Sequence, residues 1–235
     1  ITVQEQRQQH VQVLHRIMRH NIRNDLTKLR GYVDLLASDT EADTREQRAA
    51  TIQDILDKWE RMANKTQELQ NILTSEGGFT SHQSAHQIVE NIQSKKEDEH
   101  ANANITITAD HDLESQIPSD LEKAISELVE NAITANDTDH PSVQISVSEA
   151  DDRWVEVCVS DTGAGLPDME KSLLETGEET PLSHGQGLGL WMVRALVTRS
   201  GGSISVDTSG DGSEIRLEVP TQPPREDSQK PGIVS

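Results

Sequence analysis

The sequence of 235 residues contains very few aromatic residues and a single cysteine. Aromatic residues make up 2% of the chain, so any core must be built from isoleucine, leucine, valine and alanine. The single cysteine, Cys158, excludes an internal disulfide and a zinc site made of several cysteines. Its expected role is that of a small buried hydrophobe.

Long apolar runs are also missing. No stretch approaches the roughly 18 apolar residues of a membrane-spanning helix, and the first residues are polar and unlike a signal peptide. We therefore expect a cytoplasmic chain or the cytoplasmic part of something longer. The chain starts at Ile1 within a helical pattern, so we expect a fragment whose upstream region is missing.

Positive charge is scarce relative to negative charge. The chain has 21 Lys and Arg against 41 Asp and Glu, which gives a net charge of −20 and a pI of about 4.7. Because surfaces that bind nucleic acid are normally basic, this balance argues against nucleic acid as a partner. The acidic residues are spread along the chain, which indicates a solvated acidic surface. The excess of acidic residues also favours a protein from a high-salt cytoplasm, where the Debye length is about 3 Å at 1 M salt and the repulsion between like charges is screened.

Apolar residues recur every three or four positions in two segments, 11–36 and 52–73, as in Val11, Leu14, Met18, Ile22, Leu26, Leu29, Val33 and Leu36. This spacing predicts two amphipathic helices, and the polar segment 38–44 joins them into an antiparallel hairpin. Pairing with a second copy into a four-helix bundle would cover the apolar faces, so we expect a homodimer. The alternative is that the faces pack on the rest of the same chain. On helical geometry His20 lies opposite the apolar stripe and should face solvent.

After residues 75–78 the pattern changes to mixed helices and strands. We expect helices over 84–97 and from Leu121, the second opened by a capping box of Ser119 and Glu122. Alternating apolar residues predict strands around residues 105–108, 143–147 and 155–159, and a closing antiparallel hairpin over 204–219. The polar, proline-containing end of the chain, 221–235, is expected to be disordered.

Two motifs carry groups suited to binding a cation and a flat polar ligand. In ELVENA, residues 127–132, Glu127 and Asn131 lie four apart on a helix, where their oxygens could orient a water and ligate Mg²⁺. In DTGAGLP, residues 161–167, Asp161 ends a strand beside two glycines and could accept a hydrogen bond from a nucleobase amino group. A solvated polar helix face and ordinary turn chemistry would explain the same residues.

A third motif, SHGQGLGLWMVRALV at residues 183–197, places glycines before an amphipathic helix. Gly185, Gly187 and Gly189 lack the Cβ atoms that would keep a bulky anion away, and the first turn of a helix presents unpaired N–H groups. The segment is therefore a candidate phosphate-binding site. A tight turn followed by a packing helix is the simpler alternative.

Together these motifs resemble the transmitter region of two-component sensor histidine kinases. HNIRNDL at residues 20–26 is similar to the phosphoacceptor box of that family, ELVENA to its asparagine box, and DTGAGLP and GQGLGL to its two glycine boxes. The resemblance implies an α+β fold: a helical hairpin forming a dimeric four-helix bundle, residues 1–76, then an α/β sandwich of the Bergerat ATP-binding type, residues 77–220. It also implies an upstream sensor region.

The resemblance implies a role for each matching residue. His20 would accept the γ-phosphoryl group of ATP and pass it to an aspartate on the receiver domain of a response regulator. Asn131 would hold Mg²⁺, and Glu127 would stand where related ATPases place a water-activating carboxylate. Asp161 would bind adenine, and the glycines would allow close approach of the nucleotide, namely Gly163, Gly165, Gly185, Gly187 and Gly189. Residues 169–184 would form a mobile lid.

The chain departs from the family pattern near the phosphoacceptor. Asn21 replaces the acidic residue that commonly follows the histidine, and Asp25, where the family usually has proline, is a candidate substitute for it. With the acidic composition, these variants resemble the sensor kinases of salt-loving archaea. Two alternatives to the kinase are an ATPase of the same superfamily that couples hydrolysis to conformational change and a dimerisation scaffold without activity.

Overall fold

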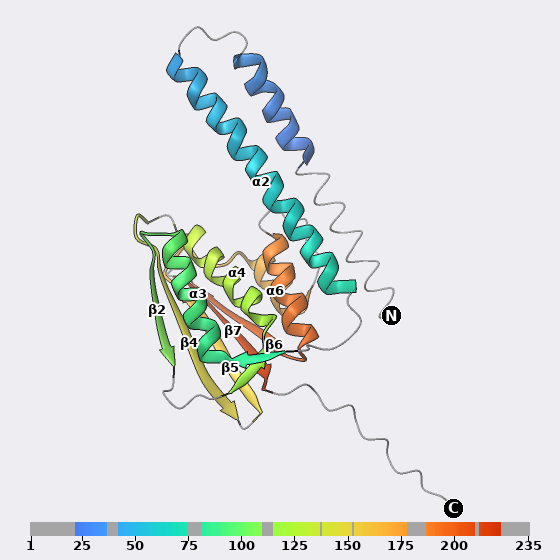
Figure 1. The fold of residues 1–235 in the computed structure, drawn as a ribbon, viewed down its shortest axis with the longest axis vertical. Helices are drawn as coiled ribbons and strands as arrows, with labels where there is room; N and C mark the ends of the chain where they lie inside the picture. The colour runs from blue at the N-terminus through green and yellow to red at the C-terminus, as the bar shows by residue number, and fades with distance from the viewer. Residues whose placement is uncertain are drawn as a thin grey trace, which may run out of the picture. The chain divides into compact units, whose positions relative to one another are not determined.

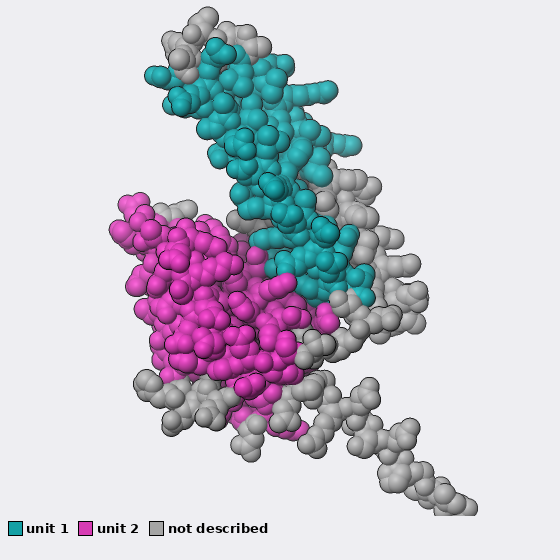
Figure 2. Space-filling view, in the orientation of Figure 1, with its two compact units in different colours: residues 1–75, 178–192 teal, residues 76–177, 193–235 magenta. Residues whose placement is uncertain are grey.

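The computed structural model in Figure 1 describes most of the chain. The described residues are 22–36, 42–74, 81–109, 115–136, 138–151, 153–177, 187–209 and 212–221. They divide into two compact units, one of residues 1–75 and 178–192 and the other of residues 76–177 and 193–235 (Figure 2). No helix among these residues combines the length and the hydropathy needed to cross a membrane.

The first unit is helical. It contains an N-terminal helix, described over residues 22–36, and the long helix α2, Ala42–Thr74. The two run side by side, as the predicted hairpin requires, and hydrogen bonds from α2 to Asp25 join them (Figure 1). In α2 the predicted apolar stripe is half-buried or buried, with Met62, Thr66 and Leu69 least exposed. The first turns of α6, Gly187–Arg199, also belong to this unit.

The second unit is built on a five-stranded sheet with the strand order β2-β4-β5-β7-β6. Its strands are β2 Asn104–Ala109, β4 Ser142–Asp151, β5 Trp154–Asp161, β6 Ser203–Ser209 and β7 Gly212–Pro220. β2 pairs parallel to β4, and the other neighbours pair antiparallel. The strands predicted from alternation are therefore confirmed, including the closing hairpin of β6 and β7.

Helices cover one face of this sheet (Figure 1). The strand residues of the other face are mostly polar, for example Gln144, Ser146, Glu156, Glu214 and Arg216. The covering helices are α3, Ala85–Glu99, and α4, Leu121–Thr134, with the second half of α6. Alternate strand residues point into the core, for example Val143, Ile145, Val147, Val155, Val157, Ile215, Leu217 and Val219. Branched aliphatic side chains fill this layer, as the shortage of aromatic residues requires.

One local prediction was wrong. The expected capping box of Ser119 and Glu122 is not formed, because α4 begins at Leu121 after Asp120 and the Ser119 backbone N–H donates to Ser81 instead. That bond supports a small two-stranded sheet of β1, His82–Ser84, and β3, Gln116–Pro118. Residues 169–176 of the predicted lid lie in a helix, α5, Asp168–Thr176, in which Leu173 and Leu174 are buried, and residues 178–184 lie outside the described residues, so the mobile lid stays a prediction.

Candidate functional site: a glycine loop against the end of α4

Helix α4 carries the first two candidate residues. Its buried face is made by Leu121, Ala124, Ile125, Leu128, Val129, Ala132 and Ile133, and this packing fixes how the helix is rotated against the sheet. Glu127 and Asn131 lie one turn apart on its half-exposed side. The Asn131 amide nitrogen is buried and makes no hydrogen bond within the described part of the chain. A buried unpaired amide is costly, so it points to a group that is kept for a ligand.

The loop after β5 carries the third candidate. Asp161 is the last residue of β5, and one of its carboxylate oxygens, Oδ1, accepts the backbone N–H of Gly163 at 2.7 Å. This bond turns the chain sharply and fixes the carboxylate at the end of the strand. Its second oxygen is then suitable for accepting an amino group of a ligand.

The end of α4 and this loop form one site. A Cβ at Gly163 would lie at ordinary contact distance from the end of α4, 3.5 Å from the carbonyl oxygen of Ala135 and 3.7 Å from the Cα of Asn136, so the loop lies against that end. The tighter approach, 3.0 Å, would be to Asp161 Oδ1. Asn136, which the sequence did not single out as a site residue, is 8% exposed, and its amide nitrogen is buried without a hydrogen bond among the described residues. The site therefore holds two unpaired amide donors from α4 and the turn that follows it.

The turn of the hairpin of β6 and β7 encloses the loop from the other side. Gly165 has a φ of +82°, and a Cβ there would meet the Ser209 carbonyl oxygen at 2.4 Å. Gly212 has a φ of +138°, and a Cβ there would lie 2.0 Å from the carbonyl oxygen of Asp161. Only glycine fits at these two positions without moving the backbone. Gly212 was missed in the sequence, where it looked like part of an ordinary hairpin turn.

The third motif is described in part. Gly187 and Gly189 belong to the first turn of α6, so they are helical residues rather than part of a preceding loop. This position keeps their N–H groups among those that have no partner within a helix. Gly185 and His20 lie outside the described residues. Among the described residues, the contacts bring the loop of Asp161, Gly163 and Gly165 against the end of α4, one turn after Asn131.

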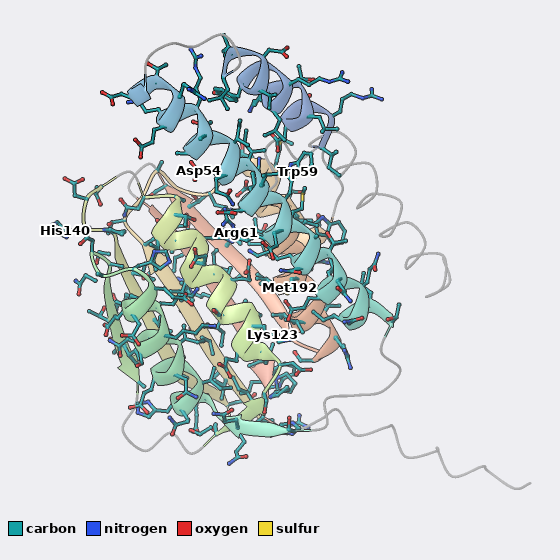
Figure 3. The ribbon with its side chains drawn as sticks, turned by 45° about the horizontal axis from the view of Figure 1, so that its top comes forward. Asp54, Trp59, Arg61, Lys123, His140 and Met192 are labelled. Carbon is teal, nitrogen blue, oxygen red and sulfur yellow. The ribbon has the colours of Figure 1, made fainter. Side chains whose placement is uncertain are left out.

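Asp25 is engaged by the neighbouring helix. Its side chain is 6% exposed, and its Oδ2 accepts hydrogen bonds from Lys58 at 3.3 Å and from the indole of Trp59 at 3.2 Å. Trp59 lies on α2 (Figure 3). A carboxylate held in this way ties the N-terminal helix to α2. This role differs from that of a free base beside the phosphoacceptor.

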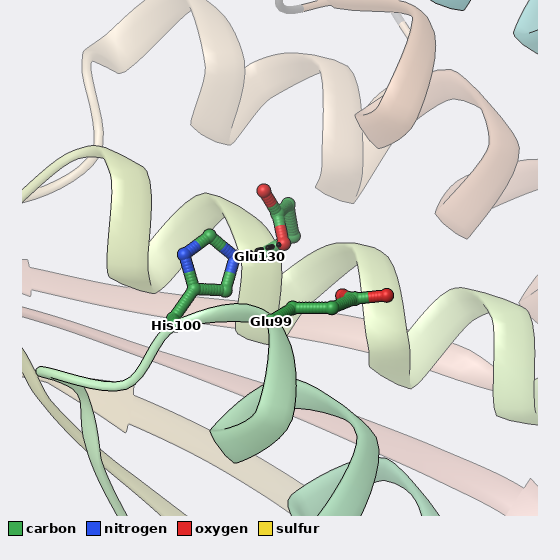
Figure 4. A group of neighbouring side chains, drawn as sticks. All are labelled: Glu99, His100 and Glu130. Atoms are coloured by element: carbon green, nitrogen blue, oxygen red, sulfur yellow. Dashed lines mark hydrogen bonds and ion pairs between the residues drawn. The ribbon is translucent and has the colours of Figure 1, made fainter.

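A cluster of Glu99, His100 and Glu130 has the composition of a metal site (Figure 4). Lys96, 7% exposed, donates to both Glu99 and Glu130 at 2.8 Å, and His100 lies 3.0 Å from the same Glu130 oxygen. Because the ammonium group of Lys96 already pairs with both carboxylates, the cluster is an ion-pair network that joins the end of α3 to α4. Burial alone would raise the pKa of Glu130, but the hydrogen bonds from Lys96 and His100 outweigh it and lower that pKa.

Comparison with known proteins identifies the family. Residues 116–223 match the family model of histidine kinase-, DNA gyrase B- and HSP90-like ATPases. The chain is 32% identical over 140 residues to the sensor histidine kinase component HK1 of Mycobacterium tuberculosis and covers 80% of that protein. It is 33% identical over 123 residues to the adaptive-response sensory kinase SasA of Prochlorococcus marinus. The chain therefore belongs to the sensor histidine kinases of two-component systems, and its second unit is an ATP-binding domain of the Bergerat type.

Solved structures support the same fold. The histidine kinase ThkA, solved in complex with the response regulator protein TrrA, superimposes with a TM-score of 0.73 at 18% identity. The match covers 94% of this chain and 66% of that one. The match to SasA covers 48% of this chain and 31% of SasA, so the chain spans about a third of the length of that relative.

Proposed function

We propose that this chain phosphorylates itself on His20 with Mg-ATP and passes the phosphoryl group to an aspartate of a response regulator. The observation that carries the proposal is the junction of α4 with the loop after β5. It places Asn131, whose amide nitrogen is buried and unpaired among the described residues, on the helix whose end packs against the loop of Asp161. Family membership supports the same reaction.

The chain's own residues supply binding and orientation. The Asp161 carboxylate accepts a hydrogen bond from the adenine amino group, and Gly163 and Gly165 let the base approach the backbone. Asn131 offers its amide oxygen to Mg²⁺, which when bound offsets the charge of the phosphates. Gly185, Gly187 and Gly189 would make up the phosphate-binding segment, and Glu127, one turn before Asn131, would take the catalytic position of the water-activating carboxylate in related ATPases.

The reaction at His20 is an in-line displacement. A neutral imidazole nitrogen forms a bond to the γ-phosphorus while the bond from that phosphorus to its bridging oxygen breaks, and ADP leaves with the electron pair. The proton of the attacking ring is released to solvent. Because Asp25 is bonded to Lys58 and Trp59, we do not assign it as the base.

A homodimer is part of the proposal. Large apolar side chains are exposed on the N-terminal helix and α2, among them Leu26 at 48%, Val33 at 54% and Leu56 at 44%. A second copy would cover them in a four-helix bundle. In this scheme residues 1–76 form the phosphotransfer and dimerisation domain, residues 77–220 the ATP-binding domain and residues 221–235 a tail.

The partner and setting follow from the same reaction. The receiver domain of a response regulator would dock on the hairpin to reach His20, and ThkA supports this because it was solved with its regulator. We propose that the chain acts in the cytoplasm, alone or as part of a membrane-anchored sensor. The net charge of −20 supports a salt-rich cytoplasm.

Labelling with γ-labelled ATP tests the proposal. In molar KCl with Mg²⁺, the wild type should acquire an acid-labile label that His20→Gln lacks, while the control His15→Gln keeps it. Asn131→Asp and Asp161→Ala should lose the label and still dimerise. If His20→Gln hydrolyses ATP as fast as the wild type, the ATPase alternative is favoured. If the wild type binds no nucleotide, the dimerisation scaffold without activity is the remaining alternative.

A further inference from the structure

The loop after β5, residues 161–167, is held by one hydroxyl group of β6, that of Thr208. The backbone N–H of Leu166 donates to Thr208 Oγ1 at 2.9 Å, and the same hydroxyl lies 3.4 Å from the Leu166 carbonyl oxygen, which can accept its proton. A hydroxyl can donate one hydrogen bond and accept others, so a single threonine serves both polar groups of one residue of the loop. The first of the two bonds is the stronger by distance.

Thr208 stands at a position where the strand pattern calls for an apolar side chain. Along β6 the alternate residues Ile204, Val206 and Thr208 are the less exposed ones, and the residues between them are exposed. A polar group on the inner side of a strand needs a partner. The partner of Thr208 is Leu166, which lies 42 residues earlier in the chain, in the loop that starts at Asp161.

The loop has few other means of keeping its shape. Two of its residues are glycines, which contribute no side-chain packing and have wide backbone freedom. One end is fixed by the bond from Gly163 to Asp161 and by the close approach of Gly212 to Asp161. At the other end, a Cβ on Gly165 would lie 2.7 Å from Thr208 Oγ1, so the threonine also faces the second glycine.

We propose that Thr208 is a positioning residue for ATP binding. Its hydroxyl fixes the Leu166 end of the loop, so that Gly163 and Gly165 are already in the shape that the adenine base requires. This inference rests on the proposed function, in which the loop binds the base. Removing the hydroxyl would leave the Leu166 N–H without its partner and let the loop sample other conformations, which lowers the fraction competent to bind.

The test compares three variants that keep the strand intact. Thr208→Val has the same shape without the hydroxyl, and Thr208→Ser keeps the hydroxyl without the methyl group. Thr108→Val is the matched control, because Thr108 lies on β2 of the same sheet and its hydroxyl accepts a hydrogen bond from the exposed side chain of Gln144 at 3.3 Å. Binding of ADP with Mg²⁺ is measured by calorimetry, and the label on His20 is followed as a function of ATP concentration.

Thr208→Val should bind ADP roughly tenfold more weakly and raise the KM for ATP by a similar factor, with kcat within about twofold. Thr208→Ser should recover most of the affinity, and Thr108→Val should match the wild type. ADP affinity unchanged in Thr208→Val would overturn the inference, and so would equal loss in the serine and valine variants. Asp161→Ala separates the two levels: if that variant binds ADP as well as the wild type, the proposed site itself is wrong.

Discussion

Replacing Lys96 by methionine should destabilise the ATP-binding domain. The Lys96 ammonium is 7% exposed and bridges Glu99 on its own helix and Glu130 on α4. Methionine keeps most of the aliphatic stem and removes the charge, so the change isolates the ion-pair network from the packing. Glu130 would retain His100 as a partner.

The expected loss is about 2 kcal/mol. Removing one member of a fully buried pair costs about 3–5 kcal/mol because the remaining charge is left without compensation. The Glu130 side chain is 28% exposed and Glu99 43%, so water and His100 recover part of that cost. A loss well above that of a surface ion pair, about 0–1 kcal/mol, is still expected.

Urea unfolding followed by circular dichroism measures this loss. Lys95→Met is the matched control, because Lys95 is the neighbouring residue, carries the same charge and is exposed. The variant Lys96→Met should unfold at a lower urea concentration, and Lys95→Met should match the wild type. Equal midpoints for the two variants would refute the reasoning from the network.

The pH dependence gives an independent readout. Because the pKa of Glu130 is lowered from 4.5, its contribution is present above that value and is lost as the pH falls through the lower pKa of the folded protein. Burial by itself would lower the pKa of Lys96, but the hydrogen bonds to Glu130 and Glu99 raise it above 10.5. The lysine contribution is therefore present below pH 10.5 and is lost as the pH rises through the raised value. In Lys96→Met the acid-side loss of stability should be smaller than in the wild type.

Two further perturbations address the hairpin and the surface charge. Trp59→Phe removes the indole donor to Asp25 and should weaken the hairpin by about 1–2 kcal/mol, seen as faster hydrogen exchange in α2, whereas Trp154→Phe in the other unit should leave that exchange unchanged. Unaltered exchange in Trp59→Phe would mean that the lysines paired with Asp25, Lys28 and Lys58, hold it without the indole. Raising KCl from about 0.1 to 1 M should raise the melting temperature, because it shortens the Debye length from about 10 to 3 Å and screens a net charge of −20. An equal rise of the melting temperature in sucrose would mean that exclusion of the cosolute from the protein surface, and not charge screening, is the cause.

Periodicity predicted the elements of the fold well because each element buries one face. The alternation of Val155, Val157 and Val159 predicted β5, and the spacing of Leu121, Ile125 and Leu128 predicted α4. The capping box of Ser119 and Glu122 was predicted wrongly for a tertiary reason: the backbone N–H of Ser119 donates to Ser81, which is distant in sequence. Helix α5 was missed because the family resemblance implied a lid over the same residues.

The site could be predicted only where a short motif carried it. Asp161, Gly163 and Gly165 share one motif, and the structure brings that motif against the end of α4. Thr208 and Gly212 come from a hairpin more than 40 residues later, and a threonine in a strand is ordinary in any sequence. The one available signal was the hydroxyl at an inward position after Ile204 and Val206. The engagement of Asp25 by Trp59 likewise depends on how two helices face one another, which a single sequence does not specify.

The single cysteine provides a natural probe of the second unit. Cys158 lies in β5, the middle strand of the five-stranded sheet, where it is 8% exposed and burial raises the pKa of its thiol. Since the thiolate is the reactive form, a thiol reagent should modify the native chain slowly and the opened sheet quickly. The helical hairpin contains no thiol, so the modification rate reports on the nucleotide-binding half alone. Added ADP that binds this half should slow the labelling, and the concentration at which it does so gives the affinity without any engineered label.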